Sequence, residues 1–314
     1  MTSFEKTFDS LGLRNWCDTD ATASPMSMSQ LLAQSGADEA GGEVLPFPSL
    51  DTLHEACAAI PQSRDMTVNV EQSFLAIKDS LKFVLDPLTQ PLSWMLEGAL
   101  YAFTTLPWWV LIPLLIWGAW AATRKLGNTI FVAFVFLFFG LIDHLEVALE
   151  TLAIIFVCTG LSVLFGVPVG ILMSRSNRIQ RVMLPILDML QTLPSFVYLI
   201  PLIFLFSVTE PKLYGIAIIL YAIVPVIRLT DLGIRLVDRD VIEAANAFGM
   251  TDRQKLYGVQ LPLALPNIMA GVNQTIMMSL AMVVIASLVS APGLGVLVLR
   301  GIRNLELGVG LVAG

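Results

Sequence analysis

Charged residues and histidines are scarce in this sequence. Only 14% of the 314 residues are charged, whereas soluble domains have about 25%, so an ordinary soluble enzyme is not expected. The two histidines, His54 and His144, have no second histidine at the spacing of a zinc site, and we predict no metal site. Since there is no G-x-x-x-x-G-K-[ST] segment and no Ser/His/Asp set, we predict no catalytic residues and no bound cofactor. No basic patch is present to bind nucleic acid.

Hydrophobic residues dominate instead, and they are unevenly distributed. They make up 56% of the chain, which has a mean hydropathy of +0.76. Residues 1–98 hold 14 of the 25 acidic residues but only 5 of the 18 basic ones. The sequence therefore predicts an all-α polytopic membrane protein that begins with an acidic polar segment.

Residues 1–65 are rich in Ser, Thr, Asp, Ala and Gly. Such a segment buries too little apolar surface to offset the entropy lost on ordering, so we predict a mostly disordered tail. No basic stretch followed by an apolar core begins the chain, and no cleaved signal peptide is expected. Within 66–98, apolar residues from Phe74 to Leu88 recur at steps of three and four, which predicts an amphipathic interfacial helix.

Apolar runs fill the remainder, 99–314, and a membrane span needs about 20 apolar residues. The six candidate spans are 100–122, 129–142, 147–173, 182–208, 213–229 and 266–289. The run 129–142 is short, and a re-entrant or tilted segment is its alternative. A last run begins near Leu305 and ends with the chain at Gly314, which predicts a truncated final span. Gly166 and Gly170 form a small-xxx-small pair that predicts close packing on another helix.

Basic residues in short loops predict the orientation, because such loops stay in the cytoplasm. Three alternate loops carry them, at Arg124 and Lys125, at Arg175, Arg178 and Arg181, and at Arg235, Arg239, Arg253 and Lys255. Counting back places the N-terminal tail on the periplasmic side, with Arg300 and Arg303 as exceptions on the outer side. Cys17 and Cys57 share this tail, where a disulfide is permitted, but two free thiols are the expectation.

One polar segment, 236–259, is longer than the roughly 2–8 residues that usually connect helices. Its helix-capping and helix-ending residues are Asp240 with Glu243, then Gly249, then Thr251 with Gln254. This pattern predicts two short helices, 241–248 and 252–259, that meet at a sharp turn on the cytoplasmic side. A rigid pair of helices can transmit force to a partner; a capped surface loop without a role is the alternative.

This segment resembles the EAA loop of the permease subunits of ABC importers. The family pattern is E-A-A, three residues, G, nine residues, I-x-L-P, and Val replaces Ile here. The matching residues are Glu243, Ala244, Ala245, Gly249, Val259, Leu261 and Pro262. The resemblance implies that 240–262 couples the chain to a separate ATPase, and that 99–314 forms a type I ABC importer transmembrane domain.

Other segments resemble the glycine betaine/proline betaine permease subunits of this family. They are 187–199, 259–275, 282–287, 293–295 and 299–301. The resemblance implies a subunit of an ATP-driven importer of these osmoprotective solutes in the bacterial inner membrane. The implied partners are an ABC ATPase dimer that holds ATP and Mg²⁺, a periplasmic substrate-binding protein, a second permease copy and the lipid bilayer. The alternatives are choline, methionine or a sulfonate as substrate or, outside transport, an osmosensing or structural membrane protein.

The implied substrate is a quaternary ammonium, which aromatic faces attract by about 0.5–2 kcal/mol each. The aromatic candidates within predicted spans are Phe196, Tyr198, Tyr214 and Tyr221. We predict that Tyr198 and Tyr221, together with Asp188 and Gln191 near the inner mouth, line the substrate path. The alternatives are aromatic residues that pack or face lipid, and an Asp188 that only reaches the cytoplasmic interface.

Overall fold

The computed structural model of this protein describes residues 63–314, which contain helices and no strand. The chain divides into two units, 1–79 and 80–314, and all contacts discussed below lie within the second. The predicted tail 1–65 lies outside the described residues, apart from 63–65. Cys17 and Cys57, for which free thiols are expected, also lie outside them.

The helices follow one another with short connections. They are α5 (Ser63–Thr105), α6 (Trp108–Thr123), α7 (Leu126–Leu141), α8 (Leu145–Arg175), α9 (Asn177–Thr192), α10 (Leu199–Leu205), α11 (Pro211–Arg235), α12 (Arg239–Ala247), α13 (Asp252–Lys255), α14 (Leu261–Ala286), α15 (Leu294–Asn304) and α16 (Leu307–Ala313). Two 3-10 turns, η1 (Ser195–Tyr198) and η3 (Ser287–Val289), and one π-helical turn, η2 (Leu256–Gln260), complete the set. The predicted interfacial helix 66–98 is thus part of the longer helix α5.

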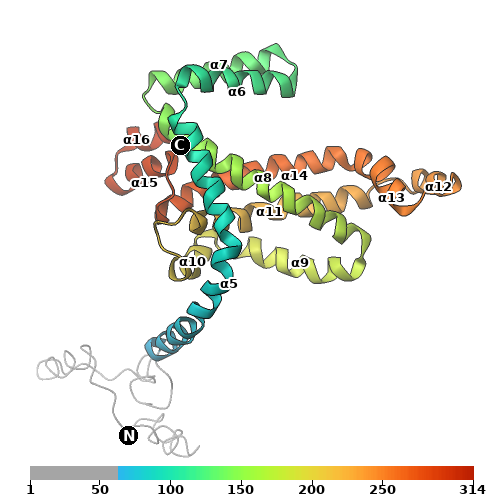
Figure 1. Cartoon of the computed structure of the whole chain (residues 1–314), viewed down its shortest axis with the longest axis horizontal. Coiled ribbons are helices and arrows are strands. Elements are labelled where there is room, and N and C mark those ends of the chain that lie inside the picture. Colours follow the sequence, from blue (N-terminus) through green and yellow to red (C-terminus); the bar gives the residue numbers. More distant parts are fainter. Residues whose placement is uncertain (1–62) are drawn as a thin grey trace, which may run out of the picture. The chain divides into compact units, whose positions relative to one another are not determined.

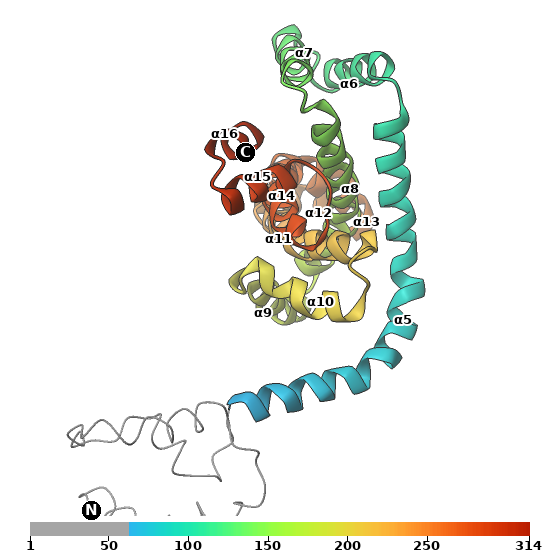
Figure 2. The ribbon, with the colours of Figure 1, turned by 90° about the vertical axis from the view of Figure 1, so that its left-hand side faces the viewer.

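Three long apolar helices, α8, α11 and α14, form the core of the second unit (Figure 1). Figure 2 views these helices nearly end-on, with α11 packed against both α8 and α14. Glycines allow the close approach, since a Cβ on Gly170 would lie only 2.6 Å from Thr230 Cβ, and one on Gly166 only 2.4 Å from Val226 Cγ1. The predicted packing role of this glycine pair is confirmed, and its partner helix is α11.

Three helices among the described residues are long and apolar enough to cross a membrane. The number rises to as many as five if each pair of helices joined by a sharp bend is counted as one span. The three are Leu145–Arg175, Pro211–Arg235 and the continuous helix Asp252–Val289. They overlap the predicted spans 147–173, 213–229 and 266–289. The predicted span 129–142 corresponds to α7, which has only 16 residues against the roughly 20 that a straight span needs.

Two predicted spans are not single helices. The run 182–208 is divided between α9 and the η1–α10 segment, whose axes are bent by 102°. The cause is local, because Leu193 precedes Pro194 and has the extended backbone that a following proline favours. The run 100–122 is likewise divided, since α5 ends at Thr105 and α6 begins after Pro107. The predicted last run, from near Leu305, contains the short helix α16.

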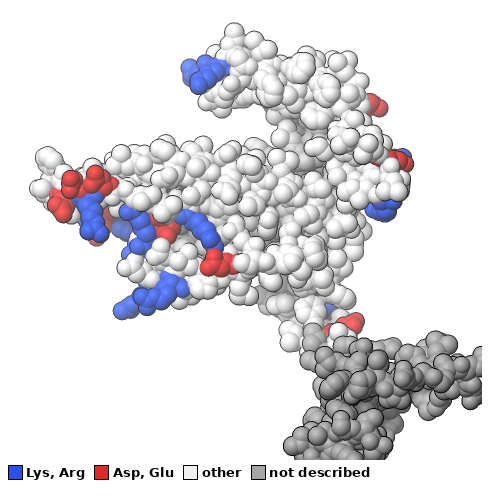
Figure 3. All heavy atoms as spheres, turned by 180° about the vertical axis from the view of Figure 1, so that it is seen from behind, with Lys and Arg blue, Asp and Glu red and all other residues white. Residues whose placement is uncertain are grey.

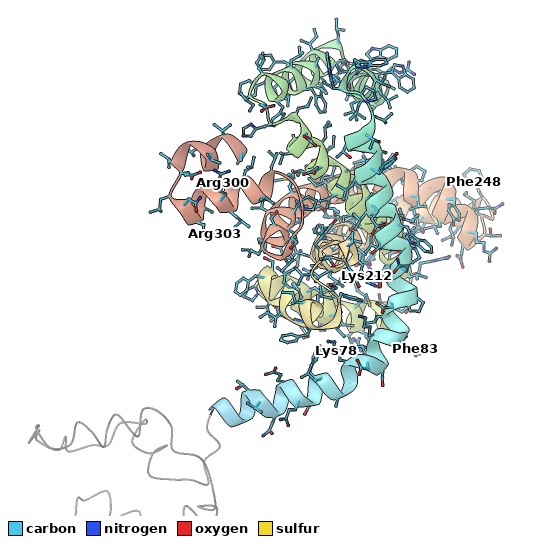
Figure 4. All side chains as sticks on the ribbon, turned by 60° about the vertical axis from the view of Figure 1, so that its left-hand side comes forward. Lys78, Phe83, Lys212, Phe248, Arg300 and Arg303 are labelled. Atoms are coloured by element: carbon cyan, nitrogen blue, oxygen red, sulfur yellow. The ribbon has the colours of Figure 1, made fainter. Side chains whose placement is uncertain are left out.

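A buried lysine joins the start of α11 to α5. Lys212 is only 4% exposed, and its Nζ lies 2.7 Å from Asp86 Oδ1 and 3.0 Å from Glu210 Oε2. The ammonium also lies 5.1 Å from the centre of the Phe206 ring, and Figure 4 shows Lys212 beside α5. Two carboxylates and an aromatic face therefore compensate a cation that would be costly to bury alone.

Candidate coupling loop and substrate path

Helix α12 begins at a cap other than the predicted one. The Asp238 carboxylate accepts a hydrogen bond from the Asp240 backbone N–H at 3.1 Å, so Asp238 is the capping residue and the prediction of Asp240 was wrong. Asp240 and Glu243 instead lie within α12. The negative charge of Asp240 still suits its position in the first turn, near the positive end of the helix dipole.

The turn after α12 has the predicted chemistry. Gly249 has φ +72°, a left-handed conformation that residues with a Cβ adopt only at an energetic cost. A complete capping box follows this glycine. The Thr251 backbone N–H donates to Gln254 Oε1 at 2.9 Å, and the Gln254 backbone N–H donates to Thr251 Oγ1 at 3.4 Å. The predictions for Gly249 and for the Thr251–Gln254 box are confirmed.

The second predicted helix does not end at Val259. Helix α13 continues through the π-helical turn η2 into α14, forming one helix from Asp252 to Val289. Lys255 connects this helix to α12, since its Nζ donates to Asn246 Oδ1 at 2.7 Å, and it also forms an ion pair with Asp252 Oδ1 within α13 at 2.8 Å. The hydrogen bond from Lys255 also holds the pKa of Asp252 below its usual range. A displacement of the turn at Gly249 is thereby connected directly to a core helix.

The EAA-type residues lie around this turn with different exposures. Ala245 is buried, Val259 and Leu261 are half-buried, and the remaining four, Glu243, Ala244, Gly249 and Pro262, are exposed. A pocket of about 290 Å³ lies beside Glu243 and Gln260, and Arg235 and Arg239 also line it. Seen from behind, many of the charged side chains gather at the end of the bundle that carries α12 and α13 (Figure 3).

Phe248 is a feature of this loop that the sequence reading missed. Its side chain is 88% exposed and points away from the bundle beyond α12 (Figure 4). The available signal was an aromatic residue immediately before the helix-ending Gly249. A single exposed apolar residue is common on protein surfaces, but this ring lies on a capped loop and is available to contact another protein.

A polar network around the buried Asp231 lies at the base of the loop, where α8, α9 and α11 meet. Asp231 is 5% exposed and accepts from Gln180 Nε2 at 2.7 Å and from Arg235 Nε at 2.8 Å. The remaining nitrogens of Arg235 donate to Asn177 Oδ1 at 2.8 Å and to the Met173 carbonyl oxygen at 2.7 Å. One guanidinium thus connects the ends of three helices directly before the chain enters α12.

Replacing Arg235 with Lys should destabilise the protein. Lysine keeps the charge but lacks the planar fork that reaches three acceptors, so we expect a loss of about 2 kcal/mol and a melting temperature lower by roughly 4–8 °C. Thermal unfolding of the purified protein in detergent measures this. Arg178→Lys, at an exposed position in α9, is the control and should leave the melting temperature unchanged. Equal melting temperatures for Arg235→Lys and the wild type would contradict the role of the network.

The predicted substrate-path residues lie on and around α9, with one addition. Asp188, on α9, forms an ion pair with Arg228 of α11, a residue that the sequence reading had not singled out. Its signal was a charged residue inside an otherwise apolar run, where a charge usually has a partner. Gln191 is half-buried and follows Asp188 by three residues, on the same side of α9.

The two predicted tyrosines lie on neighbouring elements. The Tyr198 hydroxyl, on η1, donates to the carbonyl oxygen of Leu190 on α9, and Tyr221 lies on α11. Tyr221 is half-buried and Phe196 is 54% exposed. Tyr214 is only 4% exposed, so it is packed in the core and is not available as an aromatic contact for a substrate.

Comparison with known proteins supports the resemblance. Residues 162–313 match the family of binding-protein-dependent transport system inner membrane components. The glycine betaine transport system permease protein OpuAB of Bacillus subtilis is 43% identical over 213 residues, which are 68% of this chain and 70% of that protein. The glycine betaine/carnitine permease GbuB of Listeria monocytogenes is 38% identical over 231 residues, 72% of this chain and 81% of that protein.

A third relative is similar over a shorter region. The glycine betaine/proline betaine permease ProW of Escherichia coli is 47% identical over 176 residues, which are 56% of this chain and 49% of ProW. The chain therefore spans about half the length of ProW. The trimethylamine N-oxide permease TmoV of Ruegeria pomeroyi is 37% identical over 180 residues, which are 56% of this chain and 27% of that protein.

Proposed function

Because this chain belongs to the family of binding-protein-dependent transport system inner membrane components, we propose that it is the membrane-spanning subunit of a glycine betaine/proline betaine importer. The observation that carries the substrate assignment is the 38–47% identity to permeases named for glycine betaine. The names of those relatives specify glycine betaine, alone or together with proline betaine or carnitine, and we assign the betaines to this chain. Import of these solutes protects cells against osmotic stress.

A separate ATPase supplies the energy and engages the coupling loop. Glu243, Ala244, Ala245 and Gly249 form the contact surface, with Val259, Leu261 and Pro262 at its base, and ATP with Mg²⁺ resides on the ATPase. The exposed ring of Phe248 supports this assignment, as does the rigid capping of the turn. When the ATPase dimerises, its movement passes through the turn at Gly249 into α14 and, through the Arg235 network, into α8 and α9.

The remaining partners follow from this arrangement. A periplasmic binding protein delivers the solute, and a second permease copy completes the path, because a chain with one coupling loop engages one subunit of an ATPase pair. The protein resides in the inner membrane with its N-terminal segment on the periplasmic side. The basic residues at the α12 end of the bundle support a cytoplasmic location for that end (Figure 3).

Uptake of labelled glycine betaine tests the proposal. The full chain is expressed with the ATPase and the binding protein of the same importer, in salt-stressed cells that lack their own osmolyte importers. We expect uptake that depends on the ATPase and is competed by unlabelled proline betaine. Uptake of choline, methionine or a sulfonate instead would move the substrate assignment while leaving the family assignment intact. Absence of any ATPase-dependent uptake from an assembled complex would contradict the proposed transport function.

A further inference from the structure

The ion pair between Asp188 and Arg228 joins α9 to α11 near the cytoplasmic end of the predicted span 213–229, of which Arg228 is the last residue but one. The Asp188 side chain is 60% exposed and that of Arg228 34% exposed. Ionised groups within a span usually face the interior of the bundle or a water-filled cavity.

The pair is not required to hold α9 against α11. Buried Met173, Leu187, Val224 and Ile227 already form an apolar cluster between α8, α9 and α11. The hydrogen bond between Gln180 and Asp231 provides a second, polar connection between α9 and α11. An exposed ion pair adds about 0–1 kcal/mol to stability, so its presence in an apolar span points to a role other than packing.

Arg228 retains unused hydrogen-bonding capacity. A guanidinium has five N–H donors in a planar fork that matches a carboxylate. Here one terminal nitrogen donates to Asp188, while the buried Nε has no hydrogen-bond partner among the described residues. Arg228 can therefore donate to an anionic oxygen of a ligand, either together with Asp188 or in its place.

Aromatic rings complete the surroundings of the pair. Tyr198 donates to the carbonyl oxygen of Leu190, two residues after Asp188. Tyr221 precedes Arg228 by seven residues, which places both on the same face of α11 two turns apart. Tyr198 therefore contacts α9 close to Asp188 in the chain, Tyr221 lies on α11 about two turns from Arg228, and both tyrosines are half-buried.

We propose that Asp188 and Arg228 form a zwitterion-binding site on the substrate path of this permease. Arg228 binds the anionic oxygen of the solute, and Asp188, with the rings of Tyr198 and Tyr221, binds its quaternary ammonium. Without substrate the two residues neutralise each other, so neither charge is left unpaired within the span. This inference rests on the proposed function and deepens it, since it names a solute with both charges rather than any organic cation.

The test compares variants of the full complex reconstituted with its ATPase and binding protein. Asp188→Asn and Arg228→Gln should each lower glycine betaine uptake at least tenfold, while ATP hydrolysis stimulated by the loaded binding protein stays within twofold of the wild type. The charge-swapped double variant D188R/R228D should remain as defective as the single variants, because it reverses the polarity that the solute meets. Arg178→Gln, an exposed arginine of α9 outside the site, is the matched control and should transport normally.

The outcomes separate this inference from the proposed function. If the wild type transports glycine betaine but the single variants keep more than half of its uptake, or the swapped pair restores it, the residues form a structural ion pair and the inference fails. If the wild type transports no betaine, the proposed function fails first. Arg228→Lys keeps the charge beside Asp188 and removes only the fork; it should accumulate normally and still lower uptake about threefold, and unchanged uptake would overturn the site.

Discussion

Replacing Gly249 with Asp should abolish betaine uptake while the permease stays in the membrane at its normal level. Gly249 has φ +72°, and a Cβ built there meets no atom of the described residues within 4 Å apart from its own chain neighbours. The fold therefore has room for a side chain, at a backbone cost of about 1–2 kcal/mol. The new carboxylate would instead project from the turn that we assign to the ATPase contact, and would add a negative charge beside Asp252. Labelled uptake and the amount of membrane-inserted protein measure the two effects separately.

Gly249→Asn is the matched control for this substitution. Asn has nearly the same size as Asp, tolerates positive φ and carries no charge, so it isolates the effect of the carboxylate. We expect Asn to retain part of the uptake that Asp eliminates, with both variants inserted equally. Normal uptake by Gly249→Asp at wild-type membrane levels would refute the coupling role of this turn.

Local chemistry explains why the coupling loop could be predicted from the sequence. A capping box depends on residues three apart, and a helix-ending glycine depends on its own φ, so Thr251, Gln254 and Gly249 carry their signals within a few positions. The misplaced cap at the start of α12 has the same origin. Asp238 and Asp240 are both able to cap, and only the direction in which the chain leaves α11 decides between them.

The bent segment after α9 has a feature that a hydropathy profile does not reveal, namely a break in the middle of an apolar run. The run 182–208 is apolar enough for a span, but Pro194 fixes an extended residue in its middle, and the two halves diverge by 102°. A hydropathy profile averages composition over a window and does not detect such a break. The signal for the break is instead the Leu193–Pro194 step, because the residue before a proline disfavours the helical conformation.

The ion pairs could not be predicted from the sequence, for a different reason. Asp188 and Arg228 are 40 residues apart, and Asp86 and Lys212 are 126 apart. No local pattern connects residues at such distances, because the helix packing that brings them together is a property of the whole bundle. The sequence could select Asp188 as a charge within a span, but its partner required the observed contact between α9 and α11.

The second substitution with a large expected effect is at Gly170, where α8 packs closely against α11. Replacing it with Ala should destabilise the protein by about 1–3 kcal/mol through overpacking, which lowers the melting temperature by roughly 2–12 °C. The added Cβ would lie 2.7 Å from the Ile227 carbonyl oxygen and 2.6 Å from Thr230 Cβ. A carbonyl oxygen of the backbone cannot rotate away as a side chain can, so the two helices must separate. Gly170→Leu should prevent accumulation of the folded protein altogether.

Gly160 provides the comparison within the same helix. A Cβ there meets nothing within 4 Å, so Gly160→Ala should leave the melting temperature unchanged or raise it slightly, because alanine favours the helix by about 1 kcal/mol over glycine. Thermal unfolding in detergent compares the two variants directly. A melting temperature for Gly170→Ala within one degree of that for Gly160→Ala would show that α8 and α11 can move apart without cost. The opposite result would mean that these two helices move as one body, so that a displacement of α12, which follows α11, reaches α8 as well.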